Sequence, residues 1–188
     1  MKGRIVLLFV VMEVVFLVIP SLWAKDQSAS PSQTSSACDA FGVVKSQVEK
    51  KAIPFSLKTL DGGQVDIIDC KGKPVLLKFW ATWCPSCIEE LPMMEKFSEG
   101  RKDRLVILLV AIDGEKDKKI QRIVKKHSIT LPVLLDPKAK TARSYGVNFI
   151  PVSFLISQEG LITGTVVGER DWGSPKAWSA MKELFDLR

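Results

Sequence analysis

The sequence has very little histidine and tyrosine. Among its 188 residues, His127 and Tyr145 are the only ones of their kinds. A structural zinc site built on one Cys-x-x-Cys pair needs about two further ligands at suitable spacing. Because Cys38, Cys70 and His127 do not supply a second pair, we expect no metal site, and we expect no bound cofactor. His127 follows a basic, helix-patterned stretch, so we expect it to be exposed near a helix end.

The sequence also has no stretch in which basic and aromatic side chains alternate, as they do on a nucleic-acid-binding surface. Lysine and arginine outnumber acidic residues by 27 to 21, which gives a formal net charge of +6. The densest basic stretch, residues 116–126, carries Ile120, Ile123 and Val124 at helical spacing, which indicates a solvated helix face. No aromatic side chains alternate with these charges to form a platform for bases. We therefore expect no nucleic-acid partner.

The N-terminus has the order of a targeting segment. Two basic residues precede an apolar run at 5–19 that only Glu13 interrupts, and Pro20 then ends the run. This order predicts a secretory signal peptide over residues 1–24. An uncleaved membrane anchor is the alternative, in which Glu13 near the middle would cost about 2.5–3.5 kcal/mol. Either form predicts that the folded domain is exported.

The remainder divides into a tether and one domain. Residues 25–37 (KDQSASPSQTSSA) are polar, rich in serine and without periodicity, which is typical of a flexible tether. Residues 38–188 have a globular pattern, in which short apolar runs alternate with helix-patterned segments before a closing hairpin and helix. This order predicts an α/β domain with a central mixed sheet flanked by helices.

The expected strands and helices place the later motifs. The run at 75–80 is apolar almost throughout, as in a strand buried on both faces. Ser174 is expected to cap a last helix that has Pro175 at its first position. We expect strands at 55–60, 65–68, 75–80, 105–112, 131–135, 152–156 and 161–167, and helices at 89–97, 115–127, 138–145 and 174–187.

Cys84 and Cys87 directly follow the predicted buried strand. If a helix begins at Cys84, its unpaired N–H groups and its dipole stabilise a thiolate there. Pro85 suits the first helical position, where its missing N–H costs nothing. Cys87 would lie one turn further, more buried, with Trp80 and Trp83 covering part of the pair. Two-step disulfide exchange requires one reactive thiol and one held in reserve.

Haem attachment and an inert structural disulfide are weaker interpretations of this Cys-x-x-Cys pair. Covalent haem attachment requires a histidine directly after the second cysteine, and Ile88 stands there. An inert structural disulfide would close a small, labile loop across one helical turn. We therefore predict an enzyme, a protein thiol–disulfide oxidoreductase.

Residues 72–87 (GKPVLLKFWATWCPSC) closely resemble the TlpA/ResA/CcmG group of thioredoxin-like proteins. The likeness covers most of residues 50–188 and continues in order through residues 145–147, 150–151, 154–156 and 168–172. It implies a thioredoxin-like fold with an N-terminal hairpin. Residues 113–149 are longer than the matching part of thioredoxin, which fits the helix and strand that this group inserts.

The resemblance also implies an activity, partners and a location. Members are bacterial, exported or membrane-tethered, and usually act as disulfide reductants. This implies the periplasm or the outer face of the inner membrane. Several members serve cytochrome c maturation, and others help to assemble the copper centres of respiratory oxidases. The implied partners are a disulfide-containing protein, with apocytochrome c as one candidate, and a membrane electron donor of the CcdA/DsbD type.

Further site residues follow from the same resemblance. Ile150 and Pro151 match a loop with a cis-proline that faces the active site, where the backbone of residue 150 would bind a substrate strand. Trp83 and Pro85, beside Cys84, complete the substrate-binding residues that we expect. These assignments complete a mechanism in which Cys84 attacks a disulfide and forms a mixed disulfide with the partner, which the second cysteine then resolves.

Glu90 matches an acidic residue that exchanges protons near the active site in ResA-like members. A surface carboxylate in the first turns of a helix is the alternative. Lys78 departs from the group, because many members have asparagine there. It could pair with Glu90, or its ammonium could reach the surface.

Two leftover thiols often pair in an exported domain. We therefore expect a Cys38–Cys70 disulfide that would contribute about 3–4 kcal/mol, with two free thiols as the alternative. For the function, a disulfide-forming oxidase remains open, because Pro85 and Ser86 alone do not set the reduction potential. A thiol peroxidase is weaker, because it would have a single peroxidatic cysteine without an adjacent Cys-x-x-Cys pair. A copper chaperone is weaker, because His127 is poorly placed to converge on the cysteines.

Overall fold

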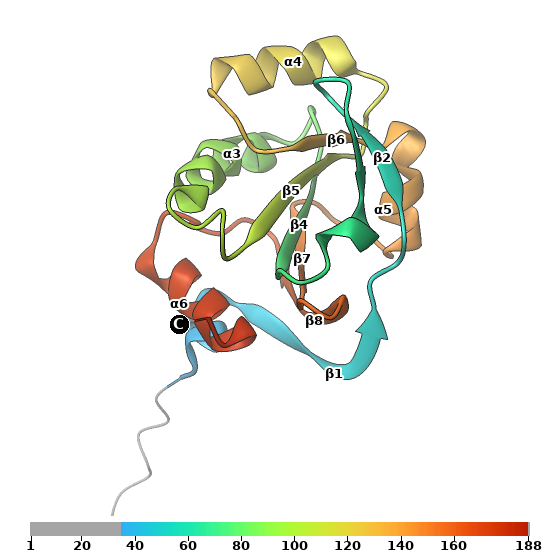
Figure 1. The fold of residues 1–188 in the computed structure, drawn as a ribbon. Helices are drawn as coiled ribbons and strands as arrows, with labels where there is room; N and C mark the ends of the chain where they lie inside the picture. Colours follow the sequence, from blue (N-terminus) through green and yellow to red (C-terminus); the bar gives the residue numbers. More distant parts are fainter. Residues whose placement is uncertain (1–34, 188) are drawn as a thin grey trace, which may run out of the picture. The chain divides into compact units, whose positions relative to one another are not determined.

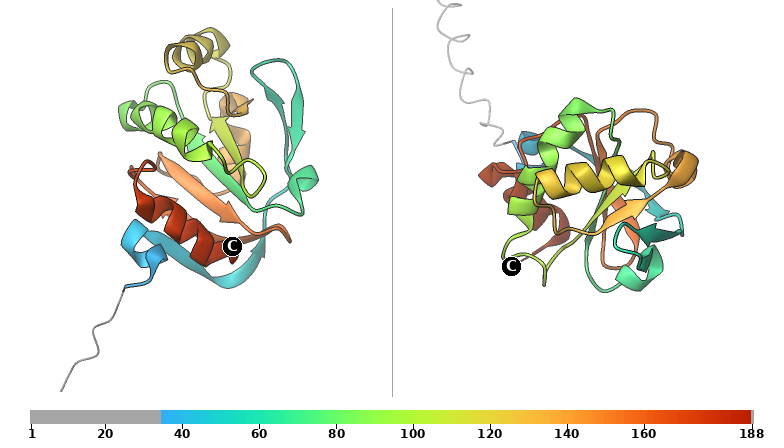
Figure 2. Two further views of the ribbon diagram at one scale, coloured as in Figure 1. Left: turned by 60° about the vertical axis from the view of Figure 1, so that its left-hand side comes forward. Right: turned by 90° about the horizontal axis from the view of Figure 1, so that it is seen from above.

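Eight strands form one mixed sheet with helices on both of its faces (Figures 1 and 2). This computed structural model describes residues 35–187. The strand order is β1-β8-β7-β4-β5-β6-β2-β3. β4 runs parallel to β5 and antiparallel to β7, so the sheet mixes both kinds of pairing, as predicted. The predicted signal or anchor at 1–24, and the tether up to residue 34, lie outside the described residues.

Every strand and helix predicted from the sequence is present, within a few residues of the expected bounds. The strands are β1 (Val43–Lys51), β2 (Ser56–Thr59), β3 (Gln64–Asp66), β4 (Val75–Trp80), β5 (Val106–Ala111), β6 (Val133–Leu135), β7 (Val152–Ile156) and β8 (Leu161–Val167). The helices are α2 (Ala37–Phe41), α3 (Pro85–Ser98), α4 (Asp117–Lys126), α5 (Lys140–Ser144) and α6 (Pro175–Phe185), with short 3₁₀ helices η2 (Ile67–Cys70) and η3 (Pro137–Ala139). None of the helices among residues 35–187 is both long and apolar enough to cross a membrane.

β1 was not predicted, because its side chains carry no strand pattern. Every residue of β1 after Val43 is exposed, so polar and apolar side chains do not alternate there. Its antiparallel pairing with β8 holds it at the edge of the sheet, and this pairing uses backbone groups only. Whether residues 43–51 form an edge strand therefore depends on β8, which is their neighbour in space and not in sequence.

β4 lies at the centre of the sheet and is buried on both faces, as its apolar run predicted. Side chains of a strand alternate between the two faces. Leu76 and Trp80 join the core cluster on the side of α3 and α6, whereas Leu77 and Phe79 join the cluster on the side of α5. β4 ends at Trp80, and the active-site helix α3 follows it after a short loop. Core clusters on both faces of the sheet therefore fix the position of β4, the strand that precedes the cysteines.

The helix α2 packs on α6 at the start of the predicted domain. The Glu183 carboxylate accepts hydrogen bonds from the backbone N–H groups of Ala37 and Cys38, at 2.6 and 3.3 Å. Its other oxygen lies 2.8 Å from Nζ of Lys45. One carboxylate of α6 thus caps the start of α2 and links it to β1.

The contribution of the Glu183 carboxylate to the stability of the fold depends on pH. The hydrogen bond from Lys45, followed by those from the backbone, lowers the pKa of Glu183 from 4.5 to about 2. A folded-state pKa below the unfolded value stabilises the fold above pH 4.5, and this contribution is lost as the pH falls toward 2. We expect the difference in unfolding free energy between wild type and Glu183→Gln to shrink across that range in denaturant titrations. Lys45→Met should weaken the same trend, and a difference that is independent of pH would contradict the assignment.

The predicted disulfide between Cys38 and Cys70 is wrong, because both thiols are free. Cys38 is fully buried in the cluster on the α3 and α6 side, with Sγ 3.6 Å from the carbonyl oxygen of Ala180. Cys70 ends η2 and packs against the cluster on the opposite face of the sheet. The sheet therefore lies between the two thiols, and the sequence spacing could not show this.

Thiol labelling tests this arrangement. Burial, and after it the charge of Glu183, raises the pKa of the Cys38 thiol to about 11, and burial also raises the pKa of the Cys70 thiol. We expect the oxidised, denatured protein to show two free thiols. In the native protein, half-buried Cys70 should react slowly, and Cys38 should react only on unfolding. Peptide mapping under non-reducing conditions that finds a Cys38–Cys70 bridge would contradict the structure.

Candidate active site

The Cys-x-x-Cys pair lies at the start of α3, as the sequence predicted. Cys84 is the N-cap residue and Pro85 is the first helical residue. A disulfide joins Cys84 to Cys87, and their Cα atoms are 5.3 Å apart. The backbone N–H of Cys87 points at the sulfur of Cys84 at 3.3 Å. Free N–H groups at a helix N-terminus favour negative charge, so a thiolate at Cys84 would be stabilised here.

The two sulfurs differ in their access to solvent. Cys84 is 6% exposed, whereas Cys87 is fully buried within the core cluster that also contains Trp80. Pro85 is exposed beside Cys84. Trp83 is 58% exposed, so of the two tryptophans predicted to cover the pair, only Trp80 is buried. A partner can therefore approach the disulfide from the side of Cys84.

Asp113, which was not among the predicted site residues, anchors the loop between β4 and α3. It is buried, and it accepts a hydrogen bond from the hydroxyl of Thr82 at 2.6 Å and from its backbone N–H at 3.2 Å. Asp113 follows the end of β5, which is paired with β4 in parallel. The carboxyl ends of parallel neighbours meet at one edge of a sheet, so an acidic residue just after β5 could have been noticed as a neighbour of the motif.

The loop before β7 and Trp83 together form one hollow beside the motif. The Ile150–Pro151 peptide bond is cis, as the family resemblance predicted. Ile150 and Trp83 line a shallow hollow of about 300 Å³, together with Phe149. Phe149 is 76% exposed, and it was not predicted as a site residue. Its only signal in the sequence is an aromatic side chain directly before Ile150. An exposed aromatic pair beside a reactive sulfur provides an apolar surface for a protein partner.

Glu90 is fully buried, so the alternative of a surface carboxylate is wrong. One of its oxygens lies 2.5 Å from Nζ of Lys78, and the other accepts hydrogen bonds from the backbone N–H of Arg170 and the indole N–H of Trp172, both at 2.9 Å. Of the two fates considered for Lys78, pairing is the one observed. Burial lowers the pKa of Lys78, and the charge of Glu90 opposes this shift. In the sequence, only the family resemblance drew attention to Arg170 and Trp172.

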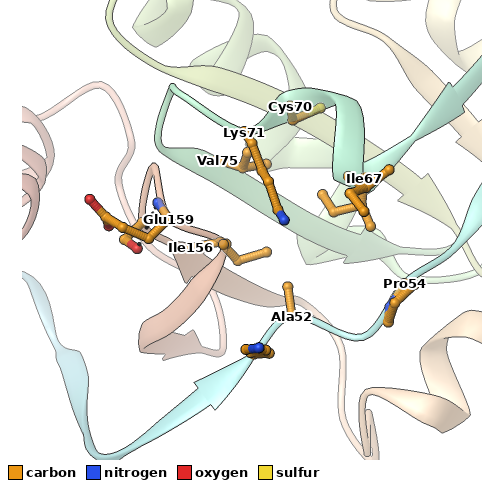
Figure 3. A pocket seen from close by; sticks show the side chains of 12 residues that line it. Ala52, Pro54, Ile67, Cys70, Lys71, Val75, Ile156 and Glu159 are labelled. Carbon is orange, nitrogen blue, oxygen red and sulfur yellow. Dashed lines mark hydrogen bonds between the residues drawn. The ribbon is translucent and has the colours of Figure 1, made fainter.

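A second cavity, of about 280 Å³, lies at the other end of β4, near Val75 (Figure 3). Its walls are largely apolar, and the Lys71 ammonium points into it. Cys70 contributes to its lining. Because β4 runs from Val75 to Trp80, this cavity is separate from the Cys84–Cys87 disulfide at the opposite end of the strand.

His127 lies at the end of α4, as expected, where it is the C-cap residue; it is half-buried, however, so the expectation that it is exposed is wrong. Within residues 35–187, no three His, Cys, Asp or Glu side chains form a group that could hold a metal ion.

Known proteins resemble this chain in sequence and in structure. The AhpC/TSA family profile matches residues 48–165. The thiol-disulfide oxidoreductase ResA of Bacillus anthracis is 33% identical over 126 residues, which cover 67% of this chain and 73% of that protein. The thioredoxin-like protein YneN of Bacillus subtilis is 36% identical over 124 residues, or 65% of this chain and 72% of that one.

Two solved structures show the same likeness. A putative thiol:disulfide interchange protein DsbE from Chlorobium tepidum superimposes with a TM-score of 0.66 at 29% identity, covering 76% of this chain and 98% of that one. StoA from Bacillus subtilis superimposes with a TM-score of 0.58 at 30% identity, covering 68% and 97%.

Proposed function

Because the chain belongs to the AhpC/TSA family of thioredoxin-like proteins and is a thiol–disulfide oxidoreductase, we propose that it reduces protein disulfides outside the cytoplasm. The observation that carries the proposal is the asymmetric pair at the start of α3. Cys84 is the more exposed residue, at the helix N-terminus, and Cys87 is fully buried. These positions suit an attacking and a resolving thiol, respectively.

The exchange proceeds in two steps from the reduced protein. The Cys84 thiolate attacks one sulfur of the partner disulfide; that disulfide breaks, a mixed disulfide forms, and the partner's other sulfur leaves and takes up a proton. The Cys87 thiolate then attacks the sulfur of Cys84. This forms the intramolecular disulfide and releases the second partner thiol. The partner gains two electrons, and the cysteine pair loses two.

Substrate binding is assigned to the surface beside Cys84. Trp83, Phe149 and Ile150 offer an apolar hollow, and Pro85 is exposed next to the attacking sulfur. The backbone of Ile150, in the loop before the cis-proline Pro151, would pair with an extended substrate segment. Backbone pairing tolerates many sequences, so this surface suits a reductant of several proteins. Apocytochrome c is one candidate substrate.

Export is supported by the apolar run at residues 5–19, which the sequence predicts to be a signal or an anchor. Each turnover leaves the cysteine pair oxidised, so an outside source of two electrons is needed. A membrane dithiol donor of the CcdA/DsbD type fits an exported reductase. It would reduce the Cys84–Cys87 disulfide by the same exchange in reverse.

The equilibrium reduction potential of the Cys84–Cys87 pair tests the direction of the reaction. It can be measured in a thiol redox buffer by trapping and counting the free thiols. We expect a value near or below that of thioredoxin, about −270 mV. A value near that of DsbA, about −120 mV, would refute the reductase proposal and make the protein a disulfide-forming oxidase.

A further inference from the structure

A buried ion pair lies between β4 and α3. Lys78 is 1% exposed and Glu90 is not exposed at all, and the two charged groups are 2.5 Å apart. Lysine and glutamate are almost never fully buried unless they are paired. Removing both charges from water is costly, and a buried pair is often no more stable than apolar side chains of similar size. Stability alone therefore gives little reason for a charged pair at this position.

The pair lies close to the resolving cysteine. Glu90 is three residues after Cys87, and side chains at this spacing are neighbours on one face of a helix, with Cβ atoms about 5–6 Å apart. Lys78 points to the same face of β4 as Trp80, and that face carries the core cluster of Cys84 and Cys87. Charges act strongly in such a poorly solvated region.

Two groups of the loop after β8 fix the carboxylate. The backbone N–H of Arg170 and the indole of Trp172 both bond the oxygen of Glu90 that Lys78 does not contact. Nζ of Lys78 lies 5.9 Å from the centre of the Trp172 ring. Glu90 is therefore held by three donors from two separate segments. These three donors fix the position of the carboxylate.

Four other charged groups lie near the pair or near the cysteine motif: Glu169, Arg170, Asp113 and Lys116. Glu169 also acts on the Lys78 ammonium, although more weakly than Glu90. The Arg170 guanidinium bonds the carbonyl oxygens of Phe41 and Glu169. On the other side of the motif, Asp113 bonds Thr82, and Lys116 lies 3.9 Å from it. None of these side-chain hydrogen bonds of Arg170 and Asp113 involves Lys78 or Glu90.

We propose that Lys78 is a positioning residue whose ammonium balances the charge of the Glu90 carboxylate, so that the two together set how readily the active-site thiols ionise. The inference rests on the proposed roles of Cys84 and Cys87. It also changes the role expected for Glu90: the carboxylate acts as half of a neutral pair beside Cys87, and not as a free base.

The proposal predicts shifts of opposite sign for the two partners. Without Lys78, the negative charge of Glu90 is unbalanced and disfavours a thiolate nearby, which raises the thiol pKa. Without the Glu90 charge, the ammonium favours a thiolate and lowers the thiol pKa. Replacing both should cancel the shifts. A pair that serves only packing would give no such reversal, because either substitution would simply loosen the same contact.

The test compares wild type, Lys78→Met, Glu90→Gln and the double variant Lys78→Met/Glu90→Gln. In each reduced protein, the rate of alkylation at Cys84 and Cys87 is followed against pH by mass spectrometry, which separates these thiols from Cys38 and Cys70. We expect shifts in thiol pKa of about one unit in opposite directions for the single variants. The double variant and the charge-conserving Lys78→Arg should titrate close to wild type.

Shifts of the same sign, or no shift in either single variant, would overturn the proposal. Circular dichroism checks that each variant folds. If Lys78→Met does not fold, Glu90→Gln decides alone: a lowered thiol pKa supports the proposal, and an unchanged or raised one overturns it. Reduction of insulin by the wild type separates the two proposals. An inactive wild type refutes the proposed function, whereas an active wild type without the opposite shifts refutes only the role of Lys78.

Discussion

Replacing Cys84 with serine should reduce disulfide reduction to the uncatalysed background, a loss on the order of a thousand-fold or more. The hydroxyl of serine cannot replace a thiolate as the nucleophile in this exchange. Replacing Cys87 with serine should instead leave the first step intact and block the second. The protein should then accumulate as a mixed disulfide with its partner, because no second thiol can release it.

Both outcomes can be read in one experiment. Reduced variants are incubated with a disulfide-containing protein, the turnover is followed, and the trapped species are identified by non-reducing electrophoresis and mass spectrometry. Cys70→Ser is the matched control, since this thiol is half-buried and packs on the opposite face of the sheet. It should retain the wild-type rate. A Cys87→Ser protein with normal turnover would contradict the assignment of the two roles.

Trp172→Ala should lower the free energy of unfolding by about 3–5 kcal/mol. The side chain is 1% exposed, and its ring packs edge-on against Phe41 at 5.0 Å and Phe97 at 5.7 Å between ring centres. Truncation would leave a cavity where α2 and α3 meet the loop after β8. It would also remove the indole donor that bonds the buried carboxylate of Glu90.

Trp83→Ala is the matched control for this loss. Both variants remove the same side chain, but Trp83 is largely exposed and is absent from both core clusters. Its truncation should change the unfolding free energy by no more than about 0.5 kcal/mol. Denaturant titration of both variants makes the comparison. Equal losses would show that burial of Trp172 does not determine its contribution.

The cysteine variants and the Trp172 variant change neighbouring parts of the same domain. The cysteine motif lies at the start of α3, and Trp172 belongs to the loop that follows β8. Glu90 connects them, since it is on the helix of the first and accepts a bond from the second. A substitution in this loop that disrupts its bond to Glu90 should therefore also affect the active site.

Local patterns in the sequence were sufficient for the central strands, the helices from α3 onward and the cysteine pair. The apolar run at 75–80 is long enough to show a strand buried on both faces, and Pro85 marks the start of α3. Helix starts and cysteine spacing depend on residues a few positions apart, so they can be read directly along the chain.

Contacts between distant segments were decided by the tertiary structure alone. β1 is a strand because β8 offers it backbone partners, and not because of its own side chains. Cys38 and Cys70 are free because the sheet separates them. In both cases, the deciding neighbour is remote in the sequence, and no local pattern encodes it.

The Lys78–Glu90 pair shows most clearly which features the sequence determined and which the tertiary structure decided. The sequence placed Glu90 one helical turn beyond Cys87 and showed Lys78 as a charge within an apolar strand. Whether that charge reached solvent or paired depended on the packing of α3 on β4, and on the loop that brings Trp172 to the same carboxylate. A buried charge is stable only where partners converge on it. The sequence by itself therefore determined which residues carry the chemistry, and the tertiary structure decided which charges surround them.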